Sequence, residues 1–270
     1  MDSFFNKNAL KYSTHNENFN MFNTFKGPLY KTNKKLYSQN GEDGILYYIF
    51  SCIGYTNKKC IEICAGNGRE CNTANLIKNH GFNGLLFDGN NSNVQIGLNF
   101  FKNDDVKFLC NWITRSNISG LIQKNNYGGD IDLLSLDIDG VDYWILKELI
   151  EKDIINPRVI VLEYQDIIGP EKRLTVPYAD DFNGWTDFIP GGGPNYCGAS
   201  LQAFISLLSN YTFIGSHEGG FNAFFIRKDI KSEYLHEETN LLENVFHFPG
   251  VQFGMNVRWN RVKDKHWVEV

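Results

Sequence analysis

The sequence predicts an α/β fold in which helices cover both faces of a mostly parallel, seven-stranded sheet. Between residues 59 and 164, short apolar runs alternate with helical segments, so that five strands can pair in parallel. A glycine-containing turn follows the first of these strands. Two more apolar runs, Tyr211–Ile214 and Asn222–Arg227, are joined by a glycine-rich loop and predict a final antiparallel hairpin. Together these features indicate a Rossmann-like sheet.

Composition limits the class of protein. A chain of 270 residues with 42% hydrophobic residues can bury a full core, and one domain with insertions is expected. The net charge of -5 and the absence of a long Lys/Arg run argue against nucleic acid and anionic lipid as partners. Because the start is polar and the longest apolar run, 44–55, cannot span a bilayer, we expect a cytoplasmic protein.

Six cysteines lack the paired C-x-x-C spacing of a zinc site. Several of them fall at apolar strand or helix positions. We therefore interpret all six as buried free thiols. They are Cys52, Cys60, Cys64, Cys71, Cys110 and Cys197.

The stretch from Lys59 to Thr73 is predicted to cradle a ligand. Its apolar residues alternate around Glu62 and suit a buried strand. Small residues then let a ligand approach the backbone closely: Ala65, Gly66 and Gly68. Arg69–His80 is predicted as a helix whose free amide groups face the same ligand, and Gly81 would end it. A plain turn with no ligand is the alternative.

Two strand ends extend this interpretation. Asp88 closes the run Gly84–Gly89 about twenty residues beyond the glycines, where a Rossmann-type fold places the carboxylate that binds ribose hydroxyls. A helix cap is the alternative. Asn111 and Trp112 follow the predicted strand Val106–Cys110, and this pair suits the wall of a purine site. For Trp112, a place in the core is the alternative.

Carboxylates gather after the fourth and fifth predicted strands. Ile131–Leu136 runs into Asp137, Asp139 and Asp142, and the strand 157–164 carries Glu163 near its end. Acidic groups this close repel one another unless a cation, protons or hydrogen-bond donors compensate. The cluster therefore indicates a functional site.

Two motifs resemble the FkbM-like methyltransferases. Ser38-Gln39-Asn40-Gly41-Glu42-Asp43 matches their S-Q-x-G-E-D helix start, where Asn40 can cap the helix and two acids favour its first turn. Asp137-Ile138-Asp139-Gly140 is similar to their D-V-E-G-type strand end, although Asp139 replaces Glu. Cys64 stands where many methyltransferases have the first glycine of an E-x-G-x-G-x-G turn. The resemblance covers most of residues 37–227.

This resemblance implies a Rossmann-like class I methyltransferase fold, S-adenosylmethionine as cofactor, and methyl transfer to an oxygen. Gln39 would close over the cofactor. The other cofactor-binding residues would be Glu62, Ala65, Gly66, Gly68, Asp88, Gly89, Asn111, Trp112 and Asp137. The hairpin also suits this class better than a dinucleotide dehydrogenase.

The chain divides into three parts. Residues 1–36 are interpreted as an N-terminal arm that packs on the domain and covers the active site, with a disordered arm as the alternative. Residues 37–230 form the Rossmann-like domain. Within it, 165–198 is too long and too rich in Pro and Gly for a simple connection, so we interpret it as a cap over the substrate. Residues 231–270 form an extension that completes the core or makes a homo-oligomer contact.

Methyl transfer to a hydroxyl needs a positioned acceptor and a base. His217, in the hairpin loop, is the candidate base, with Asp137 and Asp139 beside the reacting groups. The alternative is a divalent ion, most suitably magnesium, held by Asp137, Asp139 and Glu163. Asp137 could instead contact the cationic cofactor, and Asp139 could cap the next helix.

We therefore expect a methyltransferase that acts on a small acceptor, such as a sugar or phosphorus-linked group of a capsule or other surface-polysaccharide precursor. One rival is an NAD-dependent sugar oxidoreductase, but the turn from Cys64 to Cys71 lacks the outer glycines of G-x-G-x-x-G. The other rival is an inactive Rossmann-like protein that binds a partner.

Overall fold

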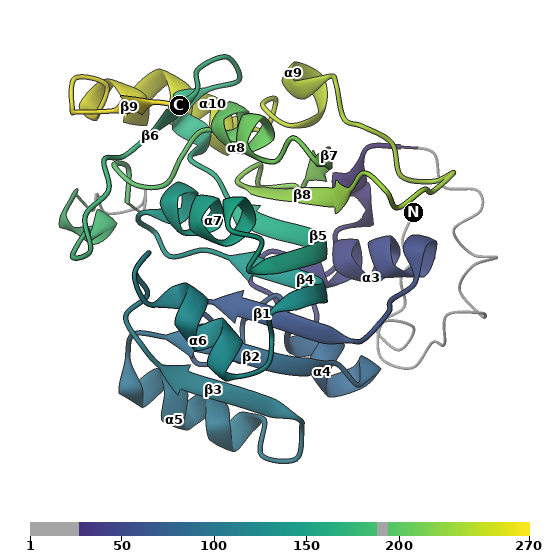
Figure 1. Cartoon of the computed structure of the whole chain (residues 1–270). Coiled ribbons are helices and arrows are strands. Elements are labelled where there is room, and N and C mark those ends of the chain that lie inside the picture. Colours follow the sequence, from purple (N-terminus) through teal and green to yellow (C-terminus); the bar gives the residue numbers. More distant parts are fainter. Residues whose placement is uncertain (1–26, 188–193) are drawn as a thin grey trace.

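The computed structural model describes residues 27–187 and 194–270, and its centre is a seven-stranded sheet (Figure 1). The strand order is β3-β2-β1-β4-β5-β8-β7. Neighbours from β3 to β5 pair in parallel, while β8 is antiparallel to both β5 and β7. The strands are β1 (Lys59–Ile63), β2 (Asn83–Asp88), β3 (Val106–Cys110), β4 (Gly129–Leu136), β5 (Ile155–Glu163), β7 (Tyr211–Ser216) and β8 (Asn222–Arg227). The predicted sheet and its closing hairpin are confirmed.

Helices cover both faces of this sheet. Helices α3, α4 and α5 pack on one face, and α6, α7 and α8 pack on the other (Figure 1). The α-helices are α3 (Glu42–Ile53), α4 (Ala74–His80), α5 (Asn91–Phe100), α6 (Ile118–Lys124), α7 (Asp142–Glu151), α8 (Leu201–Leu207), α9 (Leu241–Asn244) and α10 (Pro249–Phe253). Short helical turns are η1 (Leu29–Thr32), η2 (Asp166–Ile168), η3 (Gly184–Asp187), η4 (Gly254–Arg258) and η5 (Trp259–Arg261).

The central strands are buried on both sides because their side chains alternate between two cores. In β1, Ile61 and Ile63 pack with α6 and α7, whereas Cys60 packs toward α3 and α4. The same alternation places Phe87 in the core beside α6 and α7, and Leu86 in the core beside α3 and α4. Continuous apolar strands are the usual pattern of parallel sheets covered on both faces.

The helix predicted for 69–80 is wrong in its first turn, because α4 begins only at Ala74. Both carboxylate oxygens of Glu62 bind the segment before it. Glu62 Oε1 accepts from the Asn72 amide at 2.8 Å, and Oε2 accepts from the Thr73 amide at 2.8 Å. These bonds hold 65–73 as an irregular turn, so no helix terminus faces the predicted ligand there.

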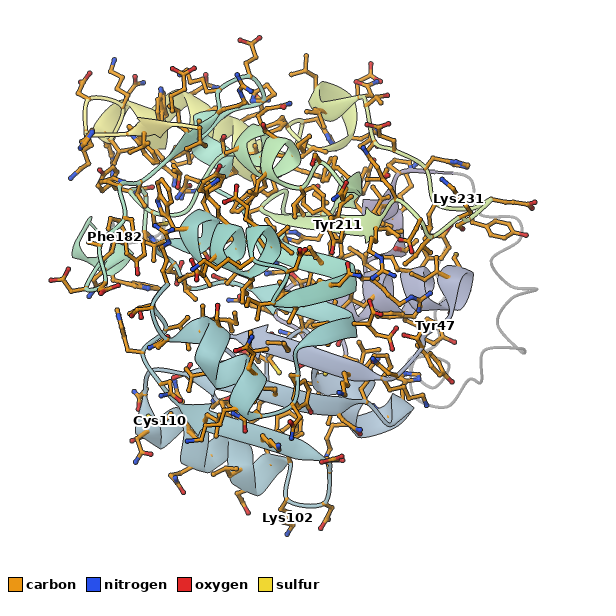
Figure 2. All side chains as sticks on the ribbon, viewed as in Figure 1. Tyr47, Lys102, Cys110, Phe182, Tyr211 and Lys231 are labelled. Atoms are coloured by element: carbon orange, nitrogen blue, oxygen red, sulfur yellow. The ribbon has the colours of Figure 1, made fainter. Side chains whose placement is uncertain are left out.

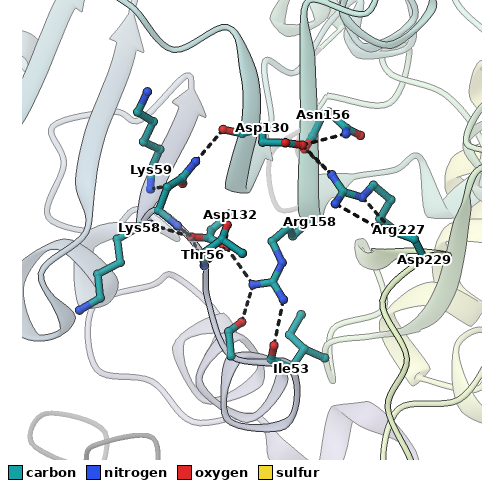
Figure 3. Close-up of polar contacts among 12 residues, drawn as sticks. Ile53, Thr56, Lys58, Lys59, Asp130, Asp132, Asn156, Arg158, Arg227 and Asp229 are labelled. Atoms are coloured by element: carbon teal, nitrogen blue, oxygen red, sulfur yellow. Dashed lines mark hydrogen bonds and ion pairs between the residues drawn. The ribbon is translucent and has the colours of Figure 1, made fainter.

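An ion-pair network lies at the opposite end of the sheet, where the parallel strands begin (Figure 3). Asp132 on β4 is fully buried and accepts hydrogen bonds from the amides of Thr56 and Lys58 and from Arg158 Nη1 at 3.0 Å. Arg158 also donates to the carbonyl of Ile53 at the end of α3. The network therefore ties the connection from α3 into β1 to the middle of the sheet.

The cap and part of the extension meet beyond the ends of β4 and β5. Strand β6 (Leu174–Thr175) pairs with β9 (Val268–Glu269), so the predicted cap is joined to the end of the chain. In the extension, Val245, Phe246 and Val251 are buried in the core that lies on the α6, α7 and α8 face of the sheet. Residues 1–26 of the predicted arm and 188–193 of the cap lie outside the described residues.

All six cysteines are free thiols, as predicted, but they are not all buried. Cys64 and Cys110 are exposed. Both follow or end a strand at the carboxyl edge, and Cys64 adopts a left-handed φ of 69° that turns the chain out of the sheet. In the described ranges 27–187 and 194–270, no helix has the length and apolar character needed to cross a bilayer.

Candidate active site

Three cavities lie around the carboxyl-terminal ends of the parallel strands. The turn cavity, of about 850 Å³, lies over the β1 turn and is lined by Gln39, Glu42, Gly66, Asp137 and Asn222 among others. The aromatic cavity, of about 470 Å³, lies beside β2 and β3, and the acidic cavity, of about 570 Å³, lies beyond β4 and β5. Cys64 lines both the turn cavity and the aromatic cavity, so these two adjoin.

The turn after β1 exposes its backbone to the turn cavity at Gly66. A Cβ at Gly66 would meet no atom within 4 Å, and φ there is +55°, a conformation that favours glycine. Ala65 lines the same cavity. Gly68 has a different environment, since a Cβ there would lie 2.6 Å from Phe101. Gly66 is thus open to a ligand, whereas Gly68 permits close packing.

The S-Q-x-G-E-D motif builds a wall of the turn cavity. Helix α3 begins at Glu42 with Gly41 as its N-cap, so the expected cap at Asn40 is wrong. Asp43 Oδ2 instead accepts from the backbone amides of Leu36, Tyr37 and Ser38 at 2.6–2.8 Å, which fixes the loop before the helix. That loop presents Gln39, an exposed residue, to the cavity.

Glu62 lines the turn cavity, but its oxygens are already engaged. Besides the amides of Asn72 and Thr73, it binds the hydroxyls of Thr73 and Ser135. Burial raises the pKa of Glu62, and these donors oppose that rise. In this structure Glu62 holds the ligand-facing turn in shape.

The aromatic cavity brings together four predicted site residues, Asp88, Gly89, Asn111 and Trp112. Asp88 Oδ1 accepts from the Asn90 amide at 2.8 Å and from Asn93 Nδ2 at 3.2 Å. Oδ2 accepts no hydrogen bond from the described residues, which leaves it available to a ligand. Trp112 is 57% exposed, so the alternative of a core tryptophan is wrong.

The cap contributes the opposite wall of this cavity. Trp112 Nε1 donates to the carbonyl of Asp180 at 2.7 Å, and Phe182 lines the cavity. Figure 2 shows Phe182 on the same side of the molecule as Cys110, at the end of β3, and far from Tyr47 and Lys231. The cap and the strand ends therefore enclose one apolar slot with a carboxylate at its side.

The carboxylates of Asp137, Asp139 and Glu163 converge, as the sequence predicted. One oxygen from each lies within 4.8 Å of the others, and all three side chains are half-buried. Burial, together with the charges of Asp139 and Asp142, raises the pKa of Asp137 to about 8. Burial, followed by the charges of Asp137, Asp139 and Asp142, also raises the pKa of Glu163 well above its usual range. Such crowded acids hold protons or a cation.

Asp142 organises the turn that carries this cluster. Its two oxygens accept from the amides of Ile138 and Gly140 at 2.8 and 3.1 Å, and α7 begins at Asp142. The alternative of Asp139 as the helix cap is therefore wrong. Asp139 has a left-handed φ of 50° and accepts from Trp185 Nε1 at 3.1 Å. This turn directs Asp139 toward the cap.

The carboxylate cluster stands between two cavities. Asp137 lines the turn cavity, while Asp139 and Glu163 line the acidic cavity. A ligand in the turn cavity and another in the acidic cavity would meet at these carboxylates. The arrangement thus suits a reaction between two bound molecules.

His217 lies in the loop between β7 and β8, as predicted. It is 1% exposed and packs against Phe221, with ring centroids 4.3 Å apart. Its Nδ1 accepts from the Asn222 amide at 3.1 Å, so the neutral ring carries its proton on Nε2. Burial lowers the pKa of His217, although Glu42 opposes this shift. Nε2 has no hydrogen-bond partner among the described residues.

Two residues that line the site, Glu42 and Arg258, carry no local signal of that role in the sequence. Glu42 is buried in the turn cavity and accepts from Asn222 Nδ2 at 2.6 Å, which links α3 to the hairpin. From the sequence, Glu42 is only a first-turn acid. Arg258 lines the acidic cavity from the extension. Neither contact follows from local spacing, because the partners lie far apart in the chain.

The strand order, the turn after β1 and the antiparallel final pair define a Rossmann-like class I methyltransferase fold. No family model and no curated protein matches the chain. Among solved structures, it is similar to a putative methyltransferase, yhhF, from Escherichia coli, with 12% identity over 63% of this chain and 75% of that chain and a TM-score of 0.39.

Two further solved structures are of the same kind. An S-adenosylmethionine-dependent methyltransferase from Clostridium acetobutylicum has 12% identity over 64% of this chain and 85% of its own, with a TM-score of 0.38. The plantazolicin methyltransferase BpumL, solved with S-adenosylhomocysteine, has 14% identity over 67% of this chain and 79% of its own, with a TM-score of 0.41. Because these values are low, the function is inferred from the residues of this chain.

Proposed function

We propose that the protein is an S-adenosylmethionine-dependent methyltransferase of the FkbM-like kind that methylates a hydroxyl oxygen. The acceptor we propose is a sugar or phosphorus-linked group of a capsule or other surface-polysaccharide precursor. The observation that carries the proposal is the pair of adjoining cavities at Cys64, which meets the acidic cavity at the cluster of Asp137, Asp139 and Glu163.

The residues of the two adjoining cavities fit this cofactor. Asp88 has a free oxygen for ribose hydroxyls, and the exposed face of Trp112 suits a purine. Gly66 admits a ligand against the backbone, while Gln39, Glu42 and Asp137 supply polar groups for the ammonium group of the cofactor's amino acid part. When bound, S-adenosylmethionine supplies an electrophilic methyl group on a sulfonium.

The acidic cavity would receive the acceptor. Asp139 and Glu163 line it beside Asp137, which lines the turn cavity, and in their ionised form they would take the proton from an acceptor hydroxyl. The same three oxygens also fit a hard divalent cation such as Mg²⁺, held by Asp137, Asp139 and Glu163. Such an ion would lower the pKa of the hydroxyl and orient it.

The first test is calorimetric titration of the purified protein with S-adenosylmethionine, S-adenosylhomocysteine and NAD, each with and without Mg²⁺. We expect the first two to bind and NAD not to bind. Binding of NAD alone would make the protein an oxidoreductase. Cofactor binding without methyl transfer to any acceptor of a broad glycan-precursor screen would favour an inactive, partner-binding protein.

The metal is tested separately. Titration of Mg²⁺ into the protein, followed by the same titration with Glu163→Gln, should show binding that the substitution abolishes. Asp105→Asn, an exposed carboxylate outside the three cavities, is the control. Equal binding by the two variants, or none by the unsubstituted protein, would leave the carboxylates as proton acceptors alone.

A further inference from the structure

The acidic cavity is built by segments from three parts of the chain. Asp139 and Glu163 come from the ends of β4 and β5, Asp166 from η2 in the cap, and Arg258 from η4 in the extension. The role of this cavity as the acceptor site rests on the proposed function.

The guanidinium group of Arg258 is held in place, but not all of its N–H groups donate hydrogen bonds within the described residues. Its Nε donates to Oδ1 of the buried Asn195 at 2.7 Å, which fixes the plane of the guanidinium group. Nη1 lies 3.8 Å from Asp166 Oδ1, which is an ion pair but too long for a hydrogen bond. Among the described residues, neither terminal nitrogen has a hydrogen-bond partner. Arg258 thus retains donors at the cavity wall.

Close backbone packing sets the spacing of Arg258 and Asp166. A Cβ at Gly254 would lie 3.0 Å from Asp166 Oδ2 and 2.9 Å from Ile167 Cγ2. The glycine therefore allows η4 to approach η2 more closely than another residue would. Because this contact holds the two turns together, the backbone sets the distance between Arg258 Nη1 and Asp166 Oδ1.

The charge of the cavity selects against anions. Four carboxylates line it, those of Asp139, Asp142, Glu163 and Asp166, and Arg258 is the one cationic side chain among its described lining residues. A carboxyl group that holds a proton adds no positive charge, so Arg258 stays the one cationic partner that this described lining offers to an anion. Each ionised carboxylate repels an anion, and a phosphate or carboxylate on the acceptor is therefore disfavoured.

A hydroxyl group fits the gap between Arg258 and Asp166. It can accept a hydrogen bond from the guanidinium and donate one to the carboxylate at the same time, and both bonds are strengthened by charge. We infer that Asp166 and Arg258 recognise a second hydroxyl of a neutral, polyhydroxylated acceptor whose first hydroxyl lies at Asp139 and Glu163. The C-terminal extension thereby sets acceptor specificity.

Ligand-detected NMR on the protein saturated with S-adenosylhomocysteine tests the preference for a neutral acceptor. The probes are the methyl glycosides of glucose, galactose and mannose, each with its matching uronic acid and 6-phosphate. We expect the neutral glycosides to bind at least about tenfold more tightly than the matching anions. Preference for an anion, or no binding by any neutral glycoside, would overturn the inference.

Substitutions test whether Arg258 and Asp166 are responsible for glycoside binding. Arg258→Gln and Asp166→Asn should each weaken glycoside binding about tenfold, since each removes one charge-assisted hydrogen bond. Affinity for S-adenosylhomocysteine should change less than twofold. Arg261→Gln, which removes the same charge from an exposed position in the same segment, is the control. Equal effects of Arg258→Gln and Arg261→Gln on glycoside binding would show that Arg258 makes no contact with the acceptor.

The failure of the inference can be told from that of the proposed function. If the unsubstituted protein binds neither S-adenosylmethionine nor S-adenosylhomocysteine, the methyltransferase proposal fails and the acceptor assignment fails with it. If the cofactor binds and the anionic probes are preferred, only the acceptor assignment is overturned.

Discussion

At the scale of single residues, Asp88 gives the most direct test of the cofactor site. Replacing Asp88 with Ala should lower the affinity for S-adenosylmethionine by about ten- to a hundredfold, because a charged hydrogen-bond acceptor is worth roughly 1.5–3 kcal/mol. Calorimetry measures the affinity, and thermal unfolding checks that the fold is kept. Asp105→Ala is the matched control at an exposed position. Unchanged affinity in the Asp88 variant would remove it from the site.

The two candidate proton acceptors can be separated by their substitutions. In the present arrangement His217 Nδ1 already accepts a hydrogen bond, so the neutral ring offers a donor at Nε2 rather than a free lone pair. Asp139 lies at the border of the two ligand cavities. We therefore expect Asp139→Asn to lower turnover by about a hundredfold or more, and His217→Gln to lower it less.

Steady-state kinetics with an unmethylated acceptor that the protein uses as substrate, together with cofactor titration, decide between them. Both variants should keep their affinity for S-adenosylmethionine within about threefold, because neither residue is engaged in the aromatic cavity. A larger loss of turnover in the His217 variant, with intact cofactor binding, would return the role of base to His217.

At the scale of elements, the network around Asp132 carries the clearest stability prediction (Figure 3). Asp132→Ala leaves Arg158 without its buried partner and removes the acceptor for several amides between α3 and β1. We expect a loss of about 3–5 kcal/mol in the free energy of unfolding, measured in urea.

Asp130 on the same strand supplies the comparison. Its side chain is 68% exposed and pairs with Arg227 at 3.1 Å. Asp130→Ala should therefore cost less than about 1 kcal/mol, as exposed ion pairs usually do. Equal losses in the two variants would mean that burial of the Asp132 network does not determine the stability of this edge.

At the scale of the whole molecule, the free energy of unfolding should depend on pH because an acidic group is buried in the acidic cavity. Burial raises the pKa of Asp166 from 3.8 to about 6, although Arg258 lowers it. Because the folded state holds this proton more tightly than the unfolded chain, the group favours folding at low pH, and this contribution is lost as the pH rises through 6.

Asp166→Asn should therefore be more stable than the unsubstituted protein at pH 8, by on the order of 2 kcal/mol, with the difference shrinking toward pH 5. Urea unfolding at pH 5, 6.5 and 8 measures it. Asp264→Asn, an exposed carboxylate of the extension, should show no such trend. A gain that is the same at all three pH values would exclude titration of Asp166 as the cause.

The fold and the strand-end residues of the site could be predicted from the sequence alone. Apolar strands that alternate with helices admit few arrangements other than a parallel sheet, and residues that follow such strands meet at one edge. Asp88, Asn111 and Trp112 thus lie together, as do Asp137, Asp139 and Glu163. The metal and the catalytic roles stay predictions.

The long-range partners that complete the site become visible only in the folded chain. Glu62 prevents the predicted early start of α4, Asn222 binds Glu42 across 180 residues, and Arg258 reaches the acidic cavity from the extension. Local patterns report which face of an element is apolar. They contain no information on which distant polar group will satisfy a buried carboxylate, because that depends on how the packed layers bring the chain together.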